Sequence, residues 1–160
     1  MTRWAILLSL LASSLLASCS RTDDAVSFID RAQKAHIDAD GLLETGDLDG
    51  ARRVLRSAVE ATPPGEIRSN DGRIVRQDLY YRLTEVELAA SRPDRAAAWA
   101  SAGLALGQAT DVFTANLHIG KARALERMSD ASGASREYHD ALLVTEALLD
   151  RSLGGSASAP

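Results

Sequence analysis

The chain has 160 residues and a formal net charge of −4, with 25% charged and only 4% aromatic residues. This length is enough for one domain with a single hydrophobic core. The mildly acidic balance argues against a nucleic-acid-binding protein, which would carry a basic surface. Alanine is abundant, and small side chains at this density favour closely packed helices over strands.

Residues 1–18 have the form of a secretory signal peptide. Arg3 precedes an apolar stretch from Trp4 to Leu16, and small residues then lead to Cys19, the only cysteine of the chain. A charged start, a short apolar core and small residues near the cleavage point are typical of such signals. The apolar stretch is shorter than the roughly 20 residues that a transmembrane helix needs. We therefore interpret it as a signal peptide.

The sequence Leu16-Ala17-Ser18-Cys19 resembles the lipobox of bacterial lipoproteins. The resemblance implies cleavage before Cys19 and acylation of its thiol, with diacylglycerol and palmitate as the lipid anchor. In Gram-negative lipoproteins an aspartate after the cysteine retains the protein at the inner membrane. Ser20 at that position therefore implies the outer membrane, facing the periplasm, whereas a Gram-positive host would place the protein on the outer face of its cell membrane. A plain signal peptide cut near Ala17 is the alternative.

Apolar residues at helical spacing predict six helices in three antiparallel pairs between residues 23 and 153. Asp23 and Asp24 are positioned to cap the first helix, and Ser91 or Arg92 to cap the fourth. The helix ends are predicted near Gly46, Pro63, Ser91, Gly107, Ser129 and Leu153.

Two segments are predicted to lie outside the helices. Asn70-Asp71-Gly72 is a turn signal, so residues 66–77 are expected to form an ordered or semi-ordered loop. Residues 154–160 are rich in glycine, serine and alanine and are expected to form a disordered tail.

Three turns share a repeated pattern, in which a small residue and a polar turn precede an alanine five positions later. The alanines are Ala51, Ala96 and Ala134. The pattern resembles the tetratricopeptide repeat (TPR), a helix–turn–helix of 34 residues. The resemblance implies an all-α fold in residues 19–153, a short right-handed α-solenoid of about three TPR-like repeats near residues 32–65, 77–110 and 115–148. A generic antiparallel helical bundle is the alternative.

The small residues of the pattern allow helices to approach closely. We expect the residues seven positions after the repeated alanines to be buried at helix crossings. These residues are Ala58, Gly103 and Ala141.

The sequence suggests no catalytic residue, no metal site and no cofactor. His36, His118 and His139 do not form a metal-binding motif, and no second cysteine supports zinc. His118 and His139 could approach each other across one helix pair, but ordinary polar or half-buried histidines are the favoured interpretation. No glycine-rich phosphate loop or nucleophile elbow occurs. We therefore expect a protein that is not an enzyme.

In TPR families the first helices of the repeats form a concave groove that binds peptides or partner helices. The resemblance assigns nine residues to such a groove: His36, Asp40, Leu43, Tyr81, Glu85, Leu88, Ile119, Arg123 and Arg127. Acidic charge at one end and basic charge at the other would suit an extended partner of opposite polarity. The alternative is that these charges only face solvent.

The insertion at residues 63–77 is a second candidate surface. It carries Arg68, Arg73 and Arg76, which could contact a partner or anionic lipid headgroups, although a plain linker is the favoured interpretation.

The predicted function is that of a membrane-anchored adaptor or assembly factor, which binds another envelope protein or a peptide. It resembles repeat-containing lipoproteins that help secretins, pili or β-barrel proteins to assemble. Tyr81 is the expected anchor, because tyrosine is favoured at binding hot spots. The alternative is a periplasmic accessory subunit or a small-ligand-binding helical protein.

Overall fold

The computed structural model describes residues 3–65, 67 and 69–154, with side chains from Asp24 onward. This part of the chain is all-helical and contains no strand, which confirms the predicted fold class. The predicted number of helices is also confirmed for the described residues. In chain order they are α1 (Arg3–Glu44), α2 (Leu48–Glu60), α3 (Ser69–Ala89), α4 (Pro93–Leu104), α5 (Val112–Arg127) and α6 (Ala131–Gly154).

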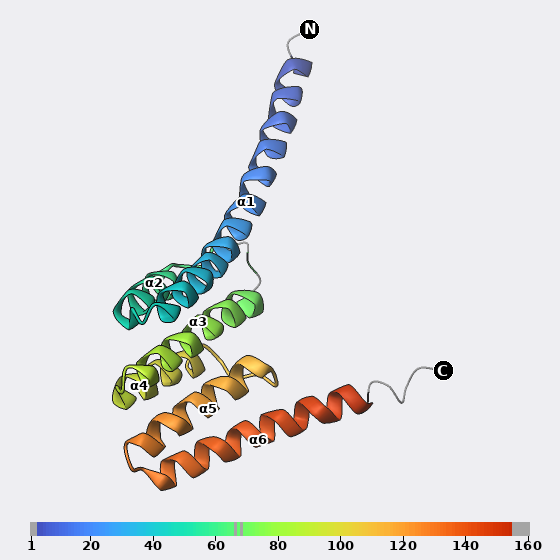
Figure 1. Cartoon of the computed structure of the whole chain (residues 1–160). Helices are drawn as coiled ribbons and strands as arrows, with labels where there is room; N and C mark the ends of the chain where they lie inside the picture. The colour runs from blue at the N-terminus through green and yellow to red at the C-terminus, as the bar shows by residue number, and fades with distance from the viewer. Residues whose placement is uncertain (1–2, 66, 68, 155–160) are drawn as a thin grey trace.

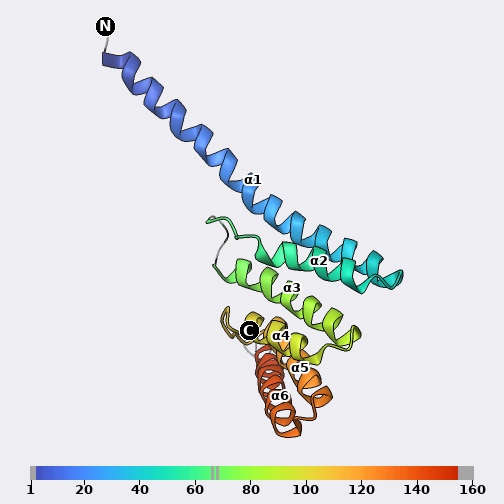
Figure 2. The ribbon, with the colours of Figure 1, turned by 90° about the vertical axis from the view of Figure 1, so that its left-hand side faces the viewer.

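The six helices form an elongated stack in which neighbours in sequence are neighbours in space (Figure 1). Each helix packs against the next one, and α3 also packs against α1 and α5. In Figure 2 the helices α2 and α3 are seen from the side, whereas α6 is seen almost along its axis. The helix direction therefore turns along the stack, and α1, α3 and α5 lie on a common side of it.

α1 is longer than the sequence predicts. Its backbone is helical from Arg3, and its N-terminal half extends away from the stack (Figure 2). Asp23 and Asp24 therefore do not start a helix as expected, because the Ala- and Leu-rich segment before them has no glycine or proline to end one. The predicted anchor Cys19 lies outside the residues whose side chains are described. No helix in the described part of the chain is both long and apolar enough to span a bilayer.

The turns inside the pairs α1–α2, α3–α4 and α5–α6 share one backbone geometry. Each has one residue in the left-handed region, namely Gly46 (φ 79°), Ser91 (φ 56°) and Ser129 (φ 62°). The next backbone N–H bonds the carbonyl five residues back, at 2.8–2.9 Å, in Asp47–Leu42, Arg92–Glu87 and Asp130–Leu125. This closure is the Schellman motif, and it occurs at the three places that the sequence repeat aligns.

Aspartates start three of the helices. The carboxylates of Asp47, Asp111 and Asp130 each accept a hydrogen bond from the backbone N–H three residues on, at 2.7, 2.9 and 2.9 Å. These bonds satisfy amides that have no partner within the helix. The expected side-chain cap of α4 is wrong. Arg92 holds the cap position without a side-chain bond, and Ser91 is the left-handed residue before it.

Ser91 and Ser129 hold a conformation that costs residues other than glycine free energy. We expect Ser91→Gly and Ser129→Gly each to raise the free energy of unfolding by about 0.5–1 kcal/mol, after the entropy cost of glycine is subtracted. Urea unfolding followed by circular dichroism measures this change. Gly46→Ser, the reverse change at the equivalent turn, should destabilise by a similar amount. An unchanged midpoint in both glycine variants would contradict this assignment.

The core is built from small residues at the helix crossings and branched residues between them. Ala39, Ala51 and Leu55 are fully buried against Leu79 and Leu83, where α1 and α2 meet α3. The repeated alanines Ala96 and Ala134 are buried as well.

The predicted burial of the three small crossing residues is confirmed for Gly103 and Ala141. A Cβ added to Gly103 would lie 2.8 Å from both Cδ atoms of Leu117, so any larger residue there would force this buried side chain to shift. The prediction is wrong for Ala58. This residue is only half-buried, because it lines an open hollow of about 500 Å³ between α1 and α2, beside Phe28 and Val54.

The predicted loop at residues 66–77 is wrong from Ser69 onward, where α3 begins. Arg73 bonds Asn70 and Gln77 along the helix and donates to the Asp111 carboxylate at 2.6 Å.

Gln77 is fully buried and donates to the carbonyls of Gly103 (3.1 Å) and Gly107 (2.8 Å). The insertion thus becomes the first turns of α3 and holds the α4–α5 connection. Arg68 lies outside the described residues.

Candidate functional site

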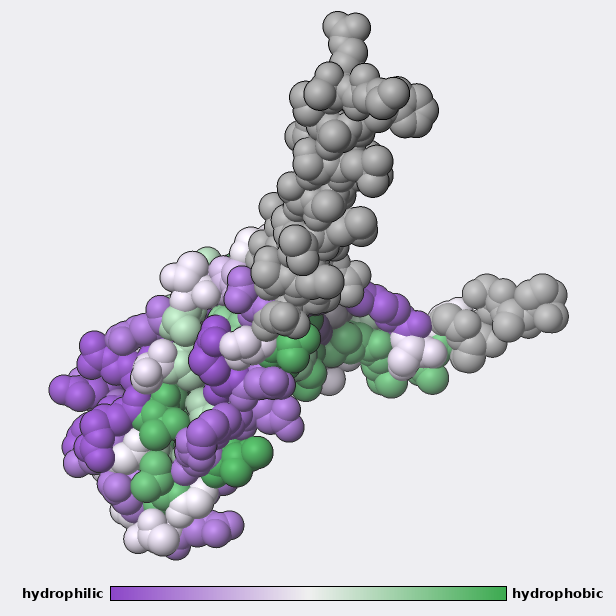
Figure 3. All heavy atoms as spheres, turned by 90° about the horizontal axis from the view of Figure 1, so that it is seen from above, coloured by the Kyte–Doolittle hydropathy of each residue, from purple (hydrophilic) through white to green (hydrophobic). Residues whose placement is uncertain are grey.

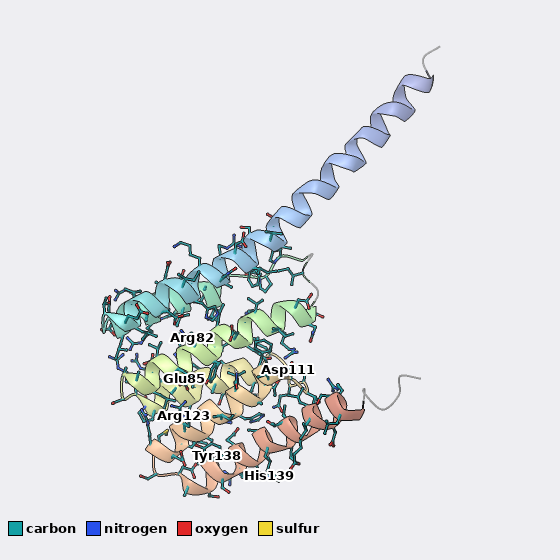
Figure 4. All side chains as sticks on the ribbon, turned by 45° about the vertical axis from the view of Figure 1, so that its right-hand side comes forward. Arg82, Glu85, Asp111, Arg123, Tyr138 and His139 are labelled. Atoms are coloured by element: carbon teal, nitrogen blue, oxygen red, sulfur yellow. The ribbon has the colours of Figure 1, made fainter. Side chains whose placement is uncertain are left out.

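The side of the stack formed by α1, α3 and α5 carries most of the residues predicted to bind a partner, and we call it the groove face. Figure 4 shows Arg82, Glu85, Arg123 and Tyr138 following one another across α3, α5 and α6. The repeat places equivalent residues of successive first helices next to each other, because α3 packs against both α1 and α5.

Polar and charged residues of the groove face pair with each other between helices. His36 Nε2 on α1 lies 3.1 Å from Asp78 Oδ2 on α3, and Asp40 pairs with Arg82. Arg123 on α5 donates to both carboxylate oxygens of Glu85 on α3, at 2.7 and 2.8 Å.

These pairs change the interpretation of the groove charges. Acidic and basic side chains do not lie unmatched at opposite ends of the groove, nor do they only face solvent. Because the pairs are partly exposed, each contributes little to stability. They link neighbouring first helices, α1 to α3 and α3 to α5.

The other predicted groove residues differ in exposure. Leu43 is half-buried against the core residues where α1 and α2 meet α3, and Ile119 is half-buried on α5. Tyr81 is half-buried on α3, and its burial, with the nearby Glu85 carboxylate, raises the pKa of its phenol. The phenol is therefore neutral at pH 7 and can serve as a hydrogen-bond donor.

Leu88 was expected in the groove, and this prediction is wrong. Leu88 is 2% exposed and packs with Ala96 and Ala124, because its side of α3 faces α4 and α5. Arg127 is exposed and donates to the Leu88 backbone carbonyl instead of projecting freely into the groove.

A hollow of about 420 Å³ opens on the groove face between α1 and α3. Its polar lining includes the paired His36 and Asp78. Ile29 and Ile37 of α1 form part of its rim and are 46% and 64% exposed, and Phe113 of α5 closes one side. Figure 3 shows apolar surface beside the point where α1 leaves the stack. An apolar lining with few fixed polar groups can take an apolar side chain and orient it by one or two hydrogen bonds.

Of the residues that line this hollow, the sequence predicted only His36 and Asp40. Ile37, Asp78 and Phe113 are among those that it did not predict. A signal for Asp78 was present. His36 and Asp40 are four residues apart on one helix, and Asp78 and Arg82 have the same spacing on the next first helix. Two such pairs of complementary chemistry predict contact between the two helices. Phe113 had no comparable signal.

The second histidine, His118, belongs to a polar cluster between α5 and α6. Its Nδ1 lies 2.7 Å from Glu137 Oε2, and the Lys121 Nζ lies 2.6 Å from Glu137 Oε1. Burial raises the pKa of Glu137, but the hydrogen bonds from Lys121 and His118 outweigh burial and hold this pKa below its usual range. His139, expected as a possible neighbour of His118, is exposed on α6.

His118, Glu137 and Asp140 lie close enough together to share a cation. The fixed positive charge of Lys121 on Glu137 opposes a metal ion there. We therefore interpret the cluster as a set of polar contacts that joins α5 to α6.

A further buried pair joins α2 to α3 on the opposite side of the stack. Arg52 Nε donates to Glu87 Oε1 at 2.7 Å, and the side chain of Glu87 is only 1% exposed. Arg52 also bonds Asp49, whereas Arg92 lies 3.9 Å from the second Glu87 oxygen. A buried carboxylate depends on such partners, because an unpaired charge is costly to bury.

Comparisons of the chain with protein-family models, with curated proteins and with solved structures found no match.

Proposed function

We propose that this protein is a lipid-anchored, periplasm-facing module that binds another envelope protein through its groove face and acts as an adaptor or assembly factor. The observation that carries the proposal is the hollow on α1 and α3, whose apolar rim is exposed and whose polar lining is already oriented. The lipobox-like sequence before Cys19 supports the location.

The same proposal includes a TPR-like solenoid of three repeats. Its support is the three identical turns at Gly46, Ser91 and Ser129, at intervals that the repeated alanines also follow. The packing of α3 on α1 and on α5 is the contact expected between the first helices of successive repeats. The right-handed sense of the solenoid belongs to the proposal.

The lining of the hollow favours binding over a reaction. It contains His36, Asp40 and Asp78, but these side chains are engaged in pairs between helices. The residues that line the hollow include no hydroxyl, thiol or amine that could attack a substrate. The open rim suits an apolar side chain of an extended or helical partner more than a small ligand, which is usually enclosed.

Ile37 gives the sharpest test, because it is exposed and belongs to the rim rather than the core. A photo-crosslinking amino acid at position 37 should trap one envelope protein in cells, identified by mass spectrometry. Ile37→Asp should reduce its co-purification about tenfold or more, since a charge would be buried against the partner.

The matched control is Leu143→Asp, which changes an equally apolar, 50% exposed residue of α6 outside the hollow. It should leave co-purification unchanged, and both variants should keep the wild-type circular dichroism spectrum. Equal capture by both variants would refute binding at the groove face.

A further inference from the structure

The helix α6 carries an apolar stripe that no described helix covers. Tyr138, Leu142 and Leu149 are 36%, 53% and 56% exposed, and their spacing of four and seven residues places them on one side of the helix. We call these three residues the α6 stripe. A hollow of about 360 Å³ adjoins Tyr138 and is lined in part by Glu126 and Ala134.

In the first two helix pairs, α1–α2 and α3–α4, the positions equivalent to Tyr138 and Leu142 are buried. The aligned alanines place Leu55 of α2 and Ala100 of α4 at the position of Tyr138, and both are 0% exposed. In the same way Val59 and Leu104 correspond to Leu142 and are 2% and 7% exposed. α3 packs on α2 and α5 packs on α4. α6 therefore has the surface of a helix that packs against a further helix, because an outer face left uncovered in a repeat array is normally polar.

We propose that the α6 stripe and the adjoining edge of α5 form a docking surface for an amphipathic α-helix of another protein. This helix would pack on α6 as α3 packs on α2. The docking surface is distinct from the hollow at Ile37, so the two proposals can fail separately.

Positively charged residues on α5 indicate which charge the docked helix should carry. Arg123 on α5 occupies the position that Asp40 occupies on α1, and Asp40 pairs with Arg82 of the helix that packs next to it. Arg127 adds a second positive charge one turn later on α5. A helix docked beside α5 should therefore carry an acidic side chain where α3 carries Arg82. Arg123 already holds Glu85 through Nη1, and its side chain is still 39% exposed.

A second copy of the chain fits this surface less well. α1 carries Lys34 and Asp38 at the positions of Leu79 and Leu83 in α3, so α1 of another copy cannot supply the apolar stripe. Two α6 helices could meet in antiparallel fashion with Leu142 opposite Leu149. That arrangement would bring the two Glu146 carboxylates together at its centre, where like charges repel.

The probe is a synthetic peptide with residues 69–90 of this chain, which contains the sequence of α3, and a second peptide with Arg82→Glu. Each is labelled with a fluorophore and titrated with the full chain, and binding is measured by fluorescence anisotropy. We expect the Arg82→Glu peptide to bind at least about fivefold more tightly than the native peptide, because it meets Arg123 instead of Asp40. Leu142→Glu in the full chain should weaken this binding about tenfold or more, since it removes an apolar contact and buries a charge.

The matched control is Leu143→Glu, which alters a 50% exposed leucine on another side of α6 and should leave the affinity unchanged. A peptide that merely displaces α3 from α2 would not respond to Leu142→Glu. The proposal is overturned if neither peptide binds, if the native peptide binds more tightly, or if Leu142→Glu has no effect. It is also overturned if sedimentation shows a dimer that Leu142→Glu abolishes, because the occupant is then a second copy.

Discussion

Replacing Cys19 with serine is expected to move the protein from the membrane fraction to the soluble fraction, or to leave it unprocessed with its signal attached. The physical reason is that acyl chains stabilise membrane binding by about 0.8 kcal/mol per buried CH₂ group, so two or three chains anchor a protein firmly. No described helix can replace such an anchor as a membrane span. Fractionation with a carbonate wash, combined with mass spectrometry of the N-terminus, measures both outcomes.

The matched control is Ser18→Ala, which keeps the small residue before the cysteine and should leave the anchor intact. A Cys19→Ser protein that has lost its signal and still resists carbonate extraction would contradict the lipid anchor. The groove face and the α6 stripe could then still bind partners, since neither depends on the anchor.

Removal of the Arg52 guanidinium is expected to have the largest effect on stability. Arg52→Leu leaves the buried Glu87 carboxylate without its main partner and should lower the free energy of unfolding by about 3–5 kcal/mol. Arg92, at 3.9 Å, is too distant to replace the lost hydrogen bond. Urea unfolding of the two proteins measures the difference.

The double variant Arg52→Leu/Glu87→Leu removes both charges and should recover much of this loss, because no unpaired charge stays buried. Arg56→Leu is the matched control on the same helix. Its pair with Glu60 is exposed, so the change should cost less than about 1 kcal/mol. If Arg52→Leu costs no more than Arg56→Leu, the pair with Glu87 does not hold α2 against α3.

The parts of the fold that depend on short-range signals could be predicted from the sequence. Gly46, Ser129 and the capping aspartates act within one turn of their own position, so the helix ends near them are confirmed. The start of α3 could not be predicted in this way. The turn signal at Asp71-Gly72 is local, whereas Gln77 is held by carbonyls of Gly103 and Gly107 from a later part of the chain.

The candidate site was likewise predictable in part: the sequence indicates which helix carries a residue, but not which way its side chain faces. The repeat placed His36, Asp40, Glu85 and Arg123 on first helices, and the structure brings them to one face of the stack. Periodicity does not fix how far each helix is rotated about its axis, so it could not reveal that Leu88 turns toward Ala96 and Ala124. Nor could it separate charges that pair between helices from charges that meet solvent.

The unbroken course of α1 has a mechanical consequence if Cys19 carries the lipid. Phe28, the first buried side chain described, follows Cys19 by nine residues, or about 14 Å along a helix. A flexible linker of that length would let the domain rotate freely relative to the bilayer. A continuous helix is stiffer and restricts the orientation of the domain relative to the bilayer. Because α1 and α6 lie at opposite ends of the stack (Figure 1), α6 would be held at a set distance from the lipid.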